Sequence, residues 1–262
     1  MELSITLMAV PRLRKSHAKL ARELERLPCD SVFLNFSRGL EEYVRELAEG
    51  LPYEYVLAEI KKSKLVQEPS GGWEYYAEPI LRNLKHLRRM KPELAFHCYE
   101  SPSYDYLAAK SAEKTALMTL RTAATGKVDA AAWRSHLEDE IRLREEAVEE
   151  EAEFIASMAS KYEKPACVTG LPGRGLRDEL AERNVEVKQK FLDLPYFYTP
   201  LEMLKNELTR SHVSDEKIVQ LVREHVDYVR KHVIPSKSLD EAYQQWVGSK
   251  NSQARSLFHF GK

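Results

Sequence analysis

Residues 5–36 read ITLMAVPRLRKSHAKLARELERLPCDSVFLNF, and the order of apolar and charged residues in this stretch decides the fold. An apolar run rich in strand-forming residues, 3–10, ends at a proline, and leucines then recur at helical spacing over 16–27. A second apolar run follows at 31–36. A strand, a helix and a second strand in this order predict parallel strands joined by right-handed crossovers.

The remainder of the chain continues this alternation of strands and helices. Further strands are expected at 93–100, 165–169 and 185–188, each between helical segments. The stretch QEPSGGW, 67–73, is rich in turn-forming residues and is expected to break the helical pattern. The expected helices cover 37–51, 52–65, 75–90, 104–125, 129–162, 214–233 and 238–247.

We therefore predict an α/β protein with a mostly parallel sheet of about four to five strands, many surrounding helices and a helical C-terminal part. Residues 1–200 are expected to form the α/β domain, and 201–262 a helical extension packed on it. The helix expected at 129–162 lacks a sustained heptad seam, which favours a solvated arm or a long packing helix over a dimeric coiled coil. The abundance of helices leaves a homodimer through helical faces open.

The positive and negative charges of the chain nearly cancel, because it has 40 Lys and Arg and 41 Asp and Glu residues. No global field therefore favours nucleic acid or an anionic membrane as a partner. The charged fraction of 31% resembles the enrichment found in thermophiles. The N-terminal segment turns basic too early for a signal peptide, and no apolar run reaches the roughly 20 residues of a membrane span, so we expect a soluble, cytoplasmic protein.

The cysteines and histidines do not form a recognisable metal motif. Cys29, Cys98 and Cys167 are widely spaced, which argues against a disulfide framework and against a thiolate zinc site. His225 and His232 lie about two helical turns apart, too far for joint ligation, and no HExxH motif is present. We therefore expect neither a metal nor a cofactor.

A glycine-rich turn, GLPGRG at 170–175, follows the strand expected at 165–169. It resembles a dinucleotide fingerprint, with Asp193 at about the distance of the ribose-binding acid, but Pro172 occupies the place of the middle glycine and has no N–H to donate. No Lys-Ser/Thr pair follows, which excludes a P-loop. The turn is therefore a simple connection, a modified nucleotide site, or an anion site formed by Arg174 and the helix N-terminus.

Two other segments place polar residues after expected strands. His97 and Glu100 lie at the end of 93–100, where open parallel sheets bind their ligands, and Glu100 is the better candidate for an acid or base. Alternation of residues along the strand favours a core position for His97. The basic run RLRK, which begins at Arg12, follows the first strand and could bind an anion at the same edge or simply start a solvated helix.

Over about two-thirds of the chain, the order of elements resembles the α/β group that includes TraB/PrgY, ChaN and the erythromycin-esterase-like proteins. Residues 5–36 look like the first strand, histidine-containing loop, helix and second strand of that group. EIRLREEAVEEEAEFIASM, 140–158, is similar to its arginine-bearing helix, and PACVTGLPGRGLRDELAERNVEV, 165–187, to its late strand, turn and helix. The resemblance implies that Arg144 reaches a site at the sheet edge.

The chain departs from that group at the positions expected to carry chemistry. Only His17 could replace the histidine that follows the first strand, Asn35 stands where a glutamate is expected, and Gly173 stands at the late histidine position. The resemblance therefore implies a member in which the site for metal- or base-assisted hydrolysis is altered or lost.

Together these observations predict a pocket at the carboxyl edge of the sheet that binds a small anionic or polar ligand, with or without catalysis. Arginines would hold the anion, Glu100 would be the acid or base, and Gly170 would give access to the backbone. One alternative is a non-enzymatic interaction or scaffold protein that acts through its long helices. Another is a nucleotide-binding protein with a modified glycine turn. The aromatic loop at 194–200 could offer a stacking surface for bases or a partner protein, or pack against the core. The predicted lining comprises Arg12, His17, Asn35, Glu100, Arg144, Gly170 and Arg174.

Overall fold

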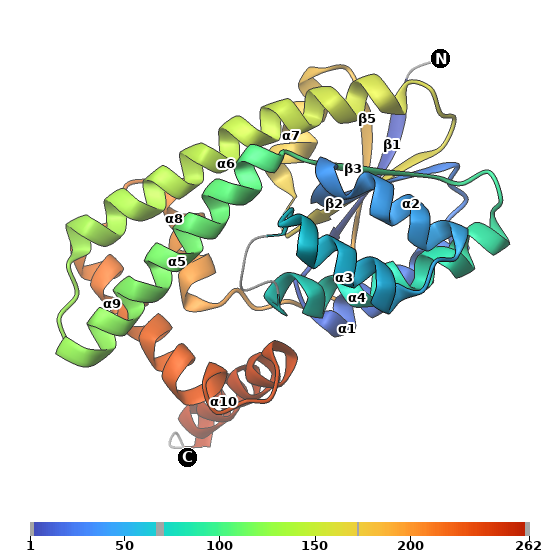
Figure 1. Ribbon diagram of the computed structural model, residues 1–262. Helices are drawn as coiled ribbons and strands as arrows, with labels where there is room; N and C mark the ends of the chain where they lie inside the picture. The colour runs from blue at the N-terminus through green and yellow to red at the C-terminus, as the bar shows by residue number, and fades with distance from the viewer. Residues whose placement is uncertain (1–2, 67–70, 172, 260–262) are drawn as a thin grey trace. The chain divides into compact units, whose positions relative to one another are not determined.

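The computed structural model describes residues 3–66, 71–171 and 173–259, and within these residues five parallel strands form one sheet (Figure 1). The predicted α/β class and parallel sheet are confirmed. The strand order across the sheet is β3-β2-β4-β1-β5. The strands are β1 (Ser4–Val10), β2 (Ser31–Ser37), β3 (Ala95–Glu100), β4 (Pro165–Gly170) and β5 (Glu186–Phe191).

The chain forms two compact units. The sheet unit combines Met1–Ala109 with Leu143–Leu194, and the helical unit combines Lys110–Arg142 with Pro195–Lys262. The helical unit thus includes residues 110–142 in addition to the helical extension predicted for 201–262. Residues 67–70 of the predicted turn, Pro172 of the glycine turn and residues 260–262 of that extension lie outside the described residues.

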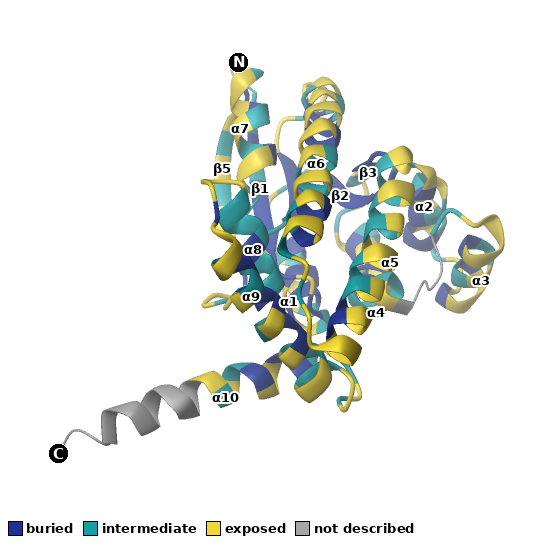
Figure 2. Ribbon diagram, turned by 90° about the vertical axis from the view of Figure 1, so that its left-hand side faces the viewer, coloured by how far each residue is buried: buried dark blue, intermediate teal, exposed yellow. Residues whose placement is uncertain are grey.

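One face of the sheet is covered by the helices that connect β1, β2 and β3. Met8 and Val10 of β1 and Val32 and Leu34 of β2 pack there against apolar side chains such as Leu84 of α4. Figure 2 shows β1 and β2 mainly as buried, whereas the edge strand β5 has exposed and intermediate residues in alternation along most of its length. The helices of this layer are α1 (Arg14–Arg26), α2 (Glu41–Glu49), α3 (Tyr53–Ser63) and α4 (Gly71–Met90).

The opposite face is covered by α7 (Arg174–Glu182) and by the second half of α6 (Ala130–Ala159). Ile5 and Leu7 of β1 and Phe33 of β2 point to this side, as the alternation of side chains along a strand requires. The segment predicted as one long helix at 129–162 is therefore helical over most of its length, and its C-terminal half packs on the sheet.

The direction of the chain explains why both faces are covered. The connections from β1 to β2 and from β2 to β3 move toward one edge of the sheet, whereas those from β3 to β4 and from β4 to β5 move toward the other. Right-handed crossovers in opposite directions place their helices on opposite faces. The chain therefore diverges at the carboxyl ends of the central strands, and open α/β sheets bind ligands in the crevice that forms at such a point.

The helical unit has a core of its own, which includes Trp133, Leu137, Leu204 and Leu221. Thr199 and Glu202 form a capping box at the start of α8, which fixes where this helix begins. The elements of this unit are most of α5 (Pro102–Thr125), the first part of α6, α8 (Pro200–Leu208), α9 (Asp215–Tyr228), a π-helical turn (Val229–Val233) and α10 (Leu239–His259).

Candidate functional site

A pocket of about 180 Å³ lies in the sheet unit, at the carboxyl ends of the strands. Its polar lining comes from four segments: Arg12 follows β1, Ser37 ends β2, Glu100 ends β3, and Asp105 lies in the first turn of α5. The pocket thus occupies the sheet edge predicted from the sequence. The other lining residues are mostly apolar or aromatic: Leu40, Leu65, Val66, Trp73, Tyr76, Tyr104, Ala108 and Ala109.

An irregularity in strand pairing brings two of the polar residues together. Leu34 pairs with Cys98, but the next pair toward the strand ends joins Ser37 to Glu100, so β2 advances by three residues while β3 advances by two. An extra residue of this kind is a β-bulge, which bends a strand and redirects its side chains. Here the register shift pairs Ser37 with Glu100, and both residues line the pocket.

Glu100 has an unusual protonation behaviour for a carboxyl group. The residue is only 8% exposed, and burial raises its pKa to about 8. Arg12 opposes this rise, and the nearby carboxyl groups of Asp105 and Glu151 add to it. Glu100 is therefore largely protonated at neutral pH and titrates just above it, which suits a group that gives or takes a proton.

Arg12 is the cation nearest to Glu100, with 3.9 Å between Nη2 and Oε1. Its side chain is 60% exposed, and its guanidinium carbon lies 6.0 Å from the ring centroid of Tyr76. Because Glu100 is largely protonated, it neutralises the charge of Arg12 only in part. Burial also raises the pKa of Asp105, although a hydrogen bond from Ser37 opposes this. Glu100 therefore leaves part of the charge of Arg12 at the pocket uncompensated.

A second arginine–glutamate pair lies behind the first. Arg144 donates two hydrogen bonds of 2.8 Å, one to each carboxylate oxygen of Glu151. The two residues are seven positions apart on α6, about two turns, and so share one helix face. The side chain of Glu151 is fully buried. Burial raises the pKa of Glu151, whereas Arg144 lowers it. This bidentate pair is internal to α6 and fixes the position of the Arg144 guanidinium.

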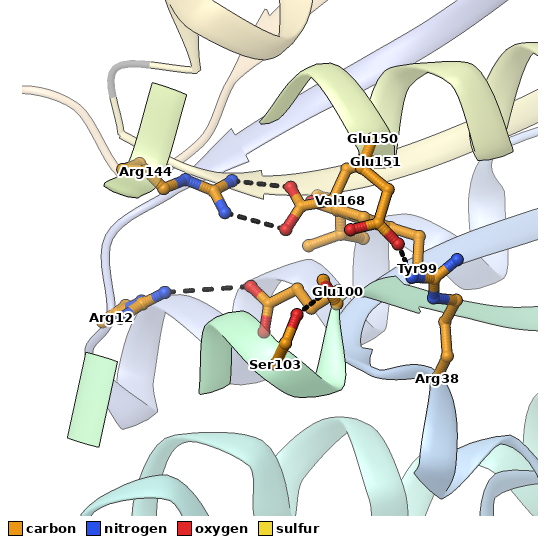
Figure 3. A network of polar contacts seen from close by, with 10 residues as sticks. Arg12, Arg38, Tyr99, Glu100, Ser103, Arg144, Glu150, Glu151 and Val168 are labelled. Atoms are coloured by element: carbon orange, nitrogen blue, oxygen red, sulfur yellow. Dashed lines mark hydrogen bonds and ion pairs between the residues drawn. The ribbon is translucent and has the colours of Figure 1, made fainter. Parts of the chain in front are cut away.

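The two pairs belong to one electrostatic network. Figure 3 shows Arg12 and Arg144 reaching toward their glutamates from the same side. Arg144 lowers the pKa of Glu100, and its guanidinium lies 4.9 Å from the ring centroid of Tyr104, which lines the pocket. The structure therefore brings together three residues that the sequence selected: Arg12, Glu100 and Arg144.

Two other selected residues lie in the interior rather than in the pocket lining. His17 is 1% exposed on α1, and its ring meets that of Tyr76 edge-on at a centroid distance of 5.1 Å. It therefore lies one layer behind the pocket. Asn35 is 3% exposed within β2, in the segment between Leu34 and Ser37 where the register shifts.

The glycine turn lies apart from the pocket lining. Gly170 ends β4 in register with Val10, and a Cβ at this position would meet no atom within 4 Å. Gly173 has a φ of +69°, and a Cβ there would lie 2.8 Å from Cγ2 of Thr169, so the connection itself requires this glycine. Arg174 begins α7 and is exposed. Neither Gly170 nor Arg174 is among the residues that line the pocket.

Sequence reasoning missed several members of the site. Glu151 is one of many acids on α6, but it follows Arg144 at an interval that returns to the same face of the helix. Asp105, Tyr104 and Tyr76 were treated only as parts of helices. His97, considered beside Glu100, accepts or donates a 2.8 Å hydrogen bond with the hydroxyl of Tyr162 and is not part of the pocket lining.

Within the described residues, no group of three or more His, Cys, Asp or Glu side chains is arranged to hold a metal ion. Among the helices of the same part of the chain, none is both long and apolar enough to cross a membrane.

Comparisons of the chain with protein-family models, with curated proteins and with solved structures find no match. The resemblance to the TraB/PrgY, ChaN and erythromycin-esterase-like group therefore stays a prediction.

Proposed function

We propose that the protein binds a small anionic molecule in the pocket at the carboxyl ends of the strands, and that Glu100 couples this binding to proton uptake. The observation that carries the proposal is the position of Glu100, with its pKa of about 8, at 3.9 Å from the exposed Arg12. Arg12 contacts the anionic group of the ligand. Protonated Glu100 donates a hydrogen bond to the same group, since a neutral carboxyl group is a donor and an ionised one is not.

The walls of the pocket suggest what the rest of the ligand is. Trp73, Tyr76 and Tyr104 contribute aromatic surface to the pocket lining. An apolar cavity of about 150 Å³ holds one benzene molecule, so a pocket of about 180 Å³ suits a body of similar size. We therefore expect an amphipathic anion, such as an aromatic carboxylate or phosphate monoester. In this proposal the protein is a member of the TraB/ChaN-like group with an altered site, and binding does not require catalysis.

Proton uptake gives the proposal a specific pH dependence. An ionised Glu100 repels the anion and neutralises Arg12, so affinity is highest below the pKa of about 8 and decreases above it. With one linked proton, the dissociation constant increases by at most about tenfold per pH unit. In Glu100→Gln, which cannot ionise, the affinity stays constant over the same range.

A thermal-shift screen with benzoate, phenyl phosphate, inorganic phosphate, ATP and NAD tests the proposal. A ligand at 100 times its dissociation constant stabilises the native state by about 2.7 kcal/mol. We expect benzoate or phenyl phosphate to stabilise the wild type and the control Arg45→Ala, but not Arg12→Ala. An effect that survives Arg12→Ala contradicts the proposal. Stabilisation by ATP or NAD that is lost in Arg174→Ala supports nucleotide binding at the glycine turn instead.

A second candidate function, protein interaction through the helical unit, is favoured by a separate observation. Leu117 and Leu120 lie about one turn apart on α5 and are 61% and 63% exposed. Exposed large apolar side chains in neighbouring positions are typical of interaction surfaces, including those of homodimers. Light scattering after size-exclusion chromatography tests this candidate, since Leu117→Glu/Leu120→Glu should reduce the measured mass if these residues join two copies.

A further inference from the structure

The pocket that contains Glu100 holds a second carboxyl group in its lining, that of Asp105. Asp105 lies in the first turn of α5, in the part of this helix that belongs to the sheet unit. The hydroxyl of Ser37 hydrogen-bonds to it, and Arg12 and Arg144 act on its charge. No ion pair in the described part of the chain includes Asp105. Because charged groups away from bulk water are normally paired, this acid can receive a cation from a ligand.

The two carboxyl groups of the pocket differ in how readily they ionise. Burial raises the pKa of both groups, to about 8 for Glu100. Two arginines lower both pKa values, and a hydrogen bond from Ser37 further lowers that of Asp105. Asp105 is also less buried than Glu100. The pocket therefore combines a protonated glutamic acid with an aspartic acid that ionises more readily, and environments that differ in this way give two carboxyl groups different roles.

The positive and negative charges of the lining are not joined directly. Arg12 lies 3.9 Å from Glu100, which pairs in register with Ser37. Ser37 in turn hydrogen-bonds to Asp105. A protonated glutamic acid and a hydroxyl group thus connect the cation to the anion, which do not neutralise each other in an ion pair. A complementary ligand carries a negative group for Arg12 and a positive group for Asp105.

The net charge of the lining also favours a ligand that carries both signs. Arg12 and Asp105 are the charged side chains that remain when Glu100 is protonated, and their charges cancel. A ligand with only a negative charge is repelled by Asp105, whereas a zwitterion is attracted by both groups. We propose that this pocket binds an amino acid with an aromatic side chain, whose carboxylate contacts Arg12 and whose ammonium group contacts Asp105. The inference rests on the proposed function, because Arg12 must hold the anionic group of the ligand.

The remaining lining residues suit the side chain of such an amino acid. Trp73, Tyr76 and Tyr104 present aromatic surface, against which another ring packs edge-on or offset. The pocket of about 180 Å³ is larger than the cavity of about 150 Å³ that holds one benzene molecule, so it has room for the ring of phenylalanine. The ammonium group has three donors and no acceptor, which matches the acceptor oxygens of an ionised Asp105.

Isothermal titration calorimetry at pH 7 with three related compounds tests the proposal. L-Phenylalanine carries both charges, 3-phenylpropionate lacks the amine, and phenethylamine lacks the carboxylate. We expect the wild type to bind L-phenylalanine about tenfold or more tightly than either other compound, because each of those lacks one charge-assisted contact. Asp105→Asn should weaken binding of L-phenylalanine about tenfold, and should bind 3-phenylpropionate at least as tightly as the wild type does. The control Asp178→Asn makes the same change on α7, outside the pocket lining, and should retain the wild-type affinities.

Arg12→Ala separates failure of this inference from failure of the proposed function. If L-phenylalanine and 3-phenylpropionate bind the wild type equally, and both lose affinity in Arg12→Ala, only the amino-acid proposal is overturned. An equal loss of affinity for both compounds in Asp105→Asn also overturns it, since Asp105 then acts on the pocket and not on the ammonium group. If neither compound binds, or if Arg12→Ala binds both like the wild type, the proposed function is overturned as well.

Discussion

Arg12 and Glu100, which follow β1 and end β3, meet at the carboxyl edge of the sheet with their Nη2 and Oε1 atoms 3.9 Å apart. Arg12 is exposed, whereas Glu100 is buried, and burial raises the pKa of Glu100 to about 8. Such a pair is not a closed salt bridge, because the carboxyl group is largely protonated when the arginine is charged. It leaves a cation and a proton donor side by side in a pocket.

The first prediction concerns stability as a function of pH. Because the pKa of Glu100 is raised from 4.5, the native state keeps a proton that the unfolded chain has already lost. The stabilisation of the native state by protonated Glu100 is fully present below pH 4.5, decreases as the pH rises, and is lost once the pH passes about 8. Within this window the free energy of unfolding decreases by at most about 1.4 kcal/mol per pH unit. Urea unfolding should show a shallower decrease in Glu100→Gln; equal slopes in the two proteins contradict the assignment.

The second prediction concerns the pair formed by Arg144 and Glu151. Removing one partner leaves a buried charge without compensation, so Arg144→Met should destabilise the native state by about 3 kcal/mol or more. Removing both charges, in Arg144→Met/Glu151→Leu, should cost less than the sum of the single variants. A double-mutant cycle measured by urea unfolding checks this. Additive effects would mean that the two side chains do not interact.

The third prediction concerns acid sensitivity of the helical unit. Burial, together with nearby Lys205, lowers the pKa of His225 from 6.5 to about 4. The contribution of neutral His225 to the free energy of unfolding is therefore fully present above pH 6.5. It decreases by about 3 kcal/mol in total as the pH falls toward 4. Trp133 lies 6.3 Å from the His225 ring and reports on this region. In a Trp73→Phe/Trp246→Phe background, unfolding followed by Trp133 fluorescence should show a smaller loss of stability between pH 7 and 4 in His225→Gln than in the parent protein. An equal loss in the two proteins would mean that His225 does not cause the acid sensitivity.

The fourth prediction concerns the glycine turn. In Gly173→Ala the new Cβ would meet Thr169 at 2.8 Å in a left-handed backbone conformation, so the variant should lose about 1–3 kcal/mol of stability. Gly170→Ala is the matched control, because its Cβ meets nothing within 4 Å. Thermal unfolding of the two variants gives the comparison. If both variants unfold like the wild type, the turn does not depend on the conformation of Gly173.

Most of the sheet was predictable from sequence because strands β1 to β4 are largely buried, mostly apolar runs between helices, whereas β5 is a charged edge strand. Phe33 and Leu34 are both buried since each face of a parallel sheet is covered, and such runs stand out in a charged chain. The same logic placed Arg12 and Glu100 correctly at one edge, since both follow or end a strand. The division into compact units was less accessible, because residues 110–142 join the C-terminal helices through contacts distant in sequence.

The rest of the site depends on features that a residue pattern does not specify. Asn35 lies in the segment where the register of β2 shifts, and the extra residue of such a bulge has no clear signature in the sequence. Glu151 was hidden among the acids of α6, although Val148 and Ile155, one turn to either side, mark the face that packs on the sheet. That apolar stripe is the signal by which Glu151 could have been found.

The most direct test of the central claim is isothermal titration calorimetry with benzoate at pH 8, in two buffers with different ionisation enthalpies. The difference in measured heat gives the number of protons taken up on binding. The account predicts uptake of a fraction of a proton by the wild type and none by Glu100→Gln, because Glu100 is close to half-protonated in the free protein at this pH. Binding without proton uptake, or equal uptake by both proteins, would contradict the coupling of Arg12 and Glu100 to a bound anion.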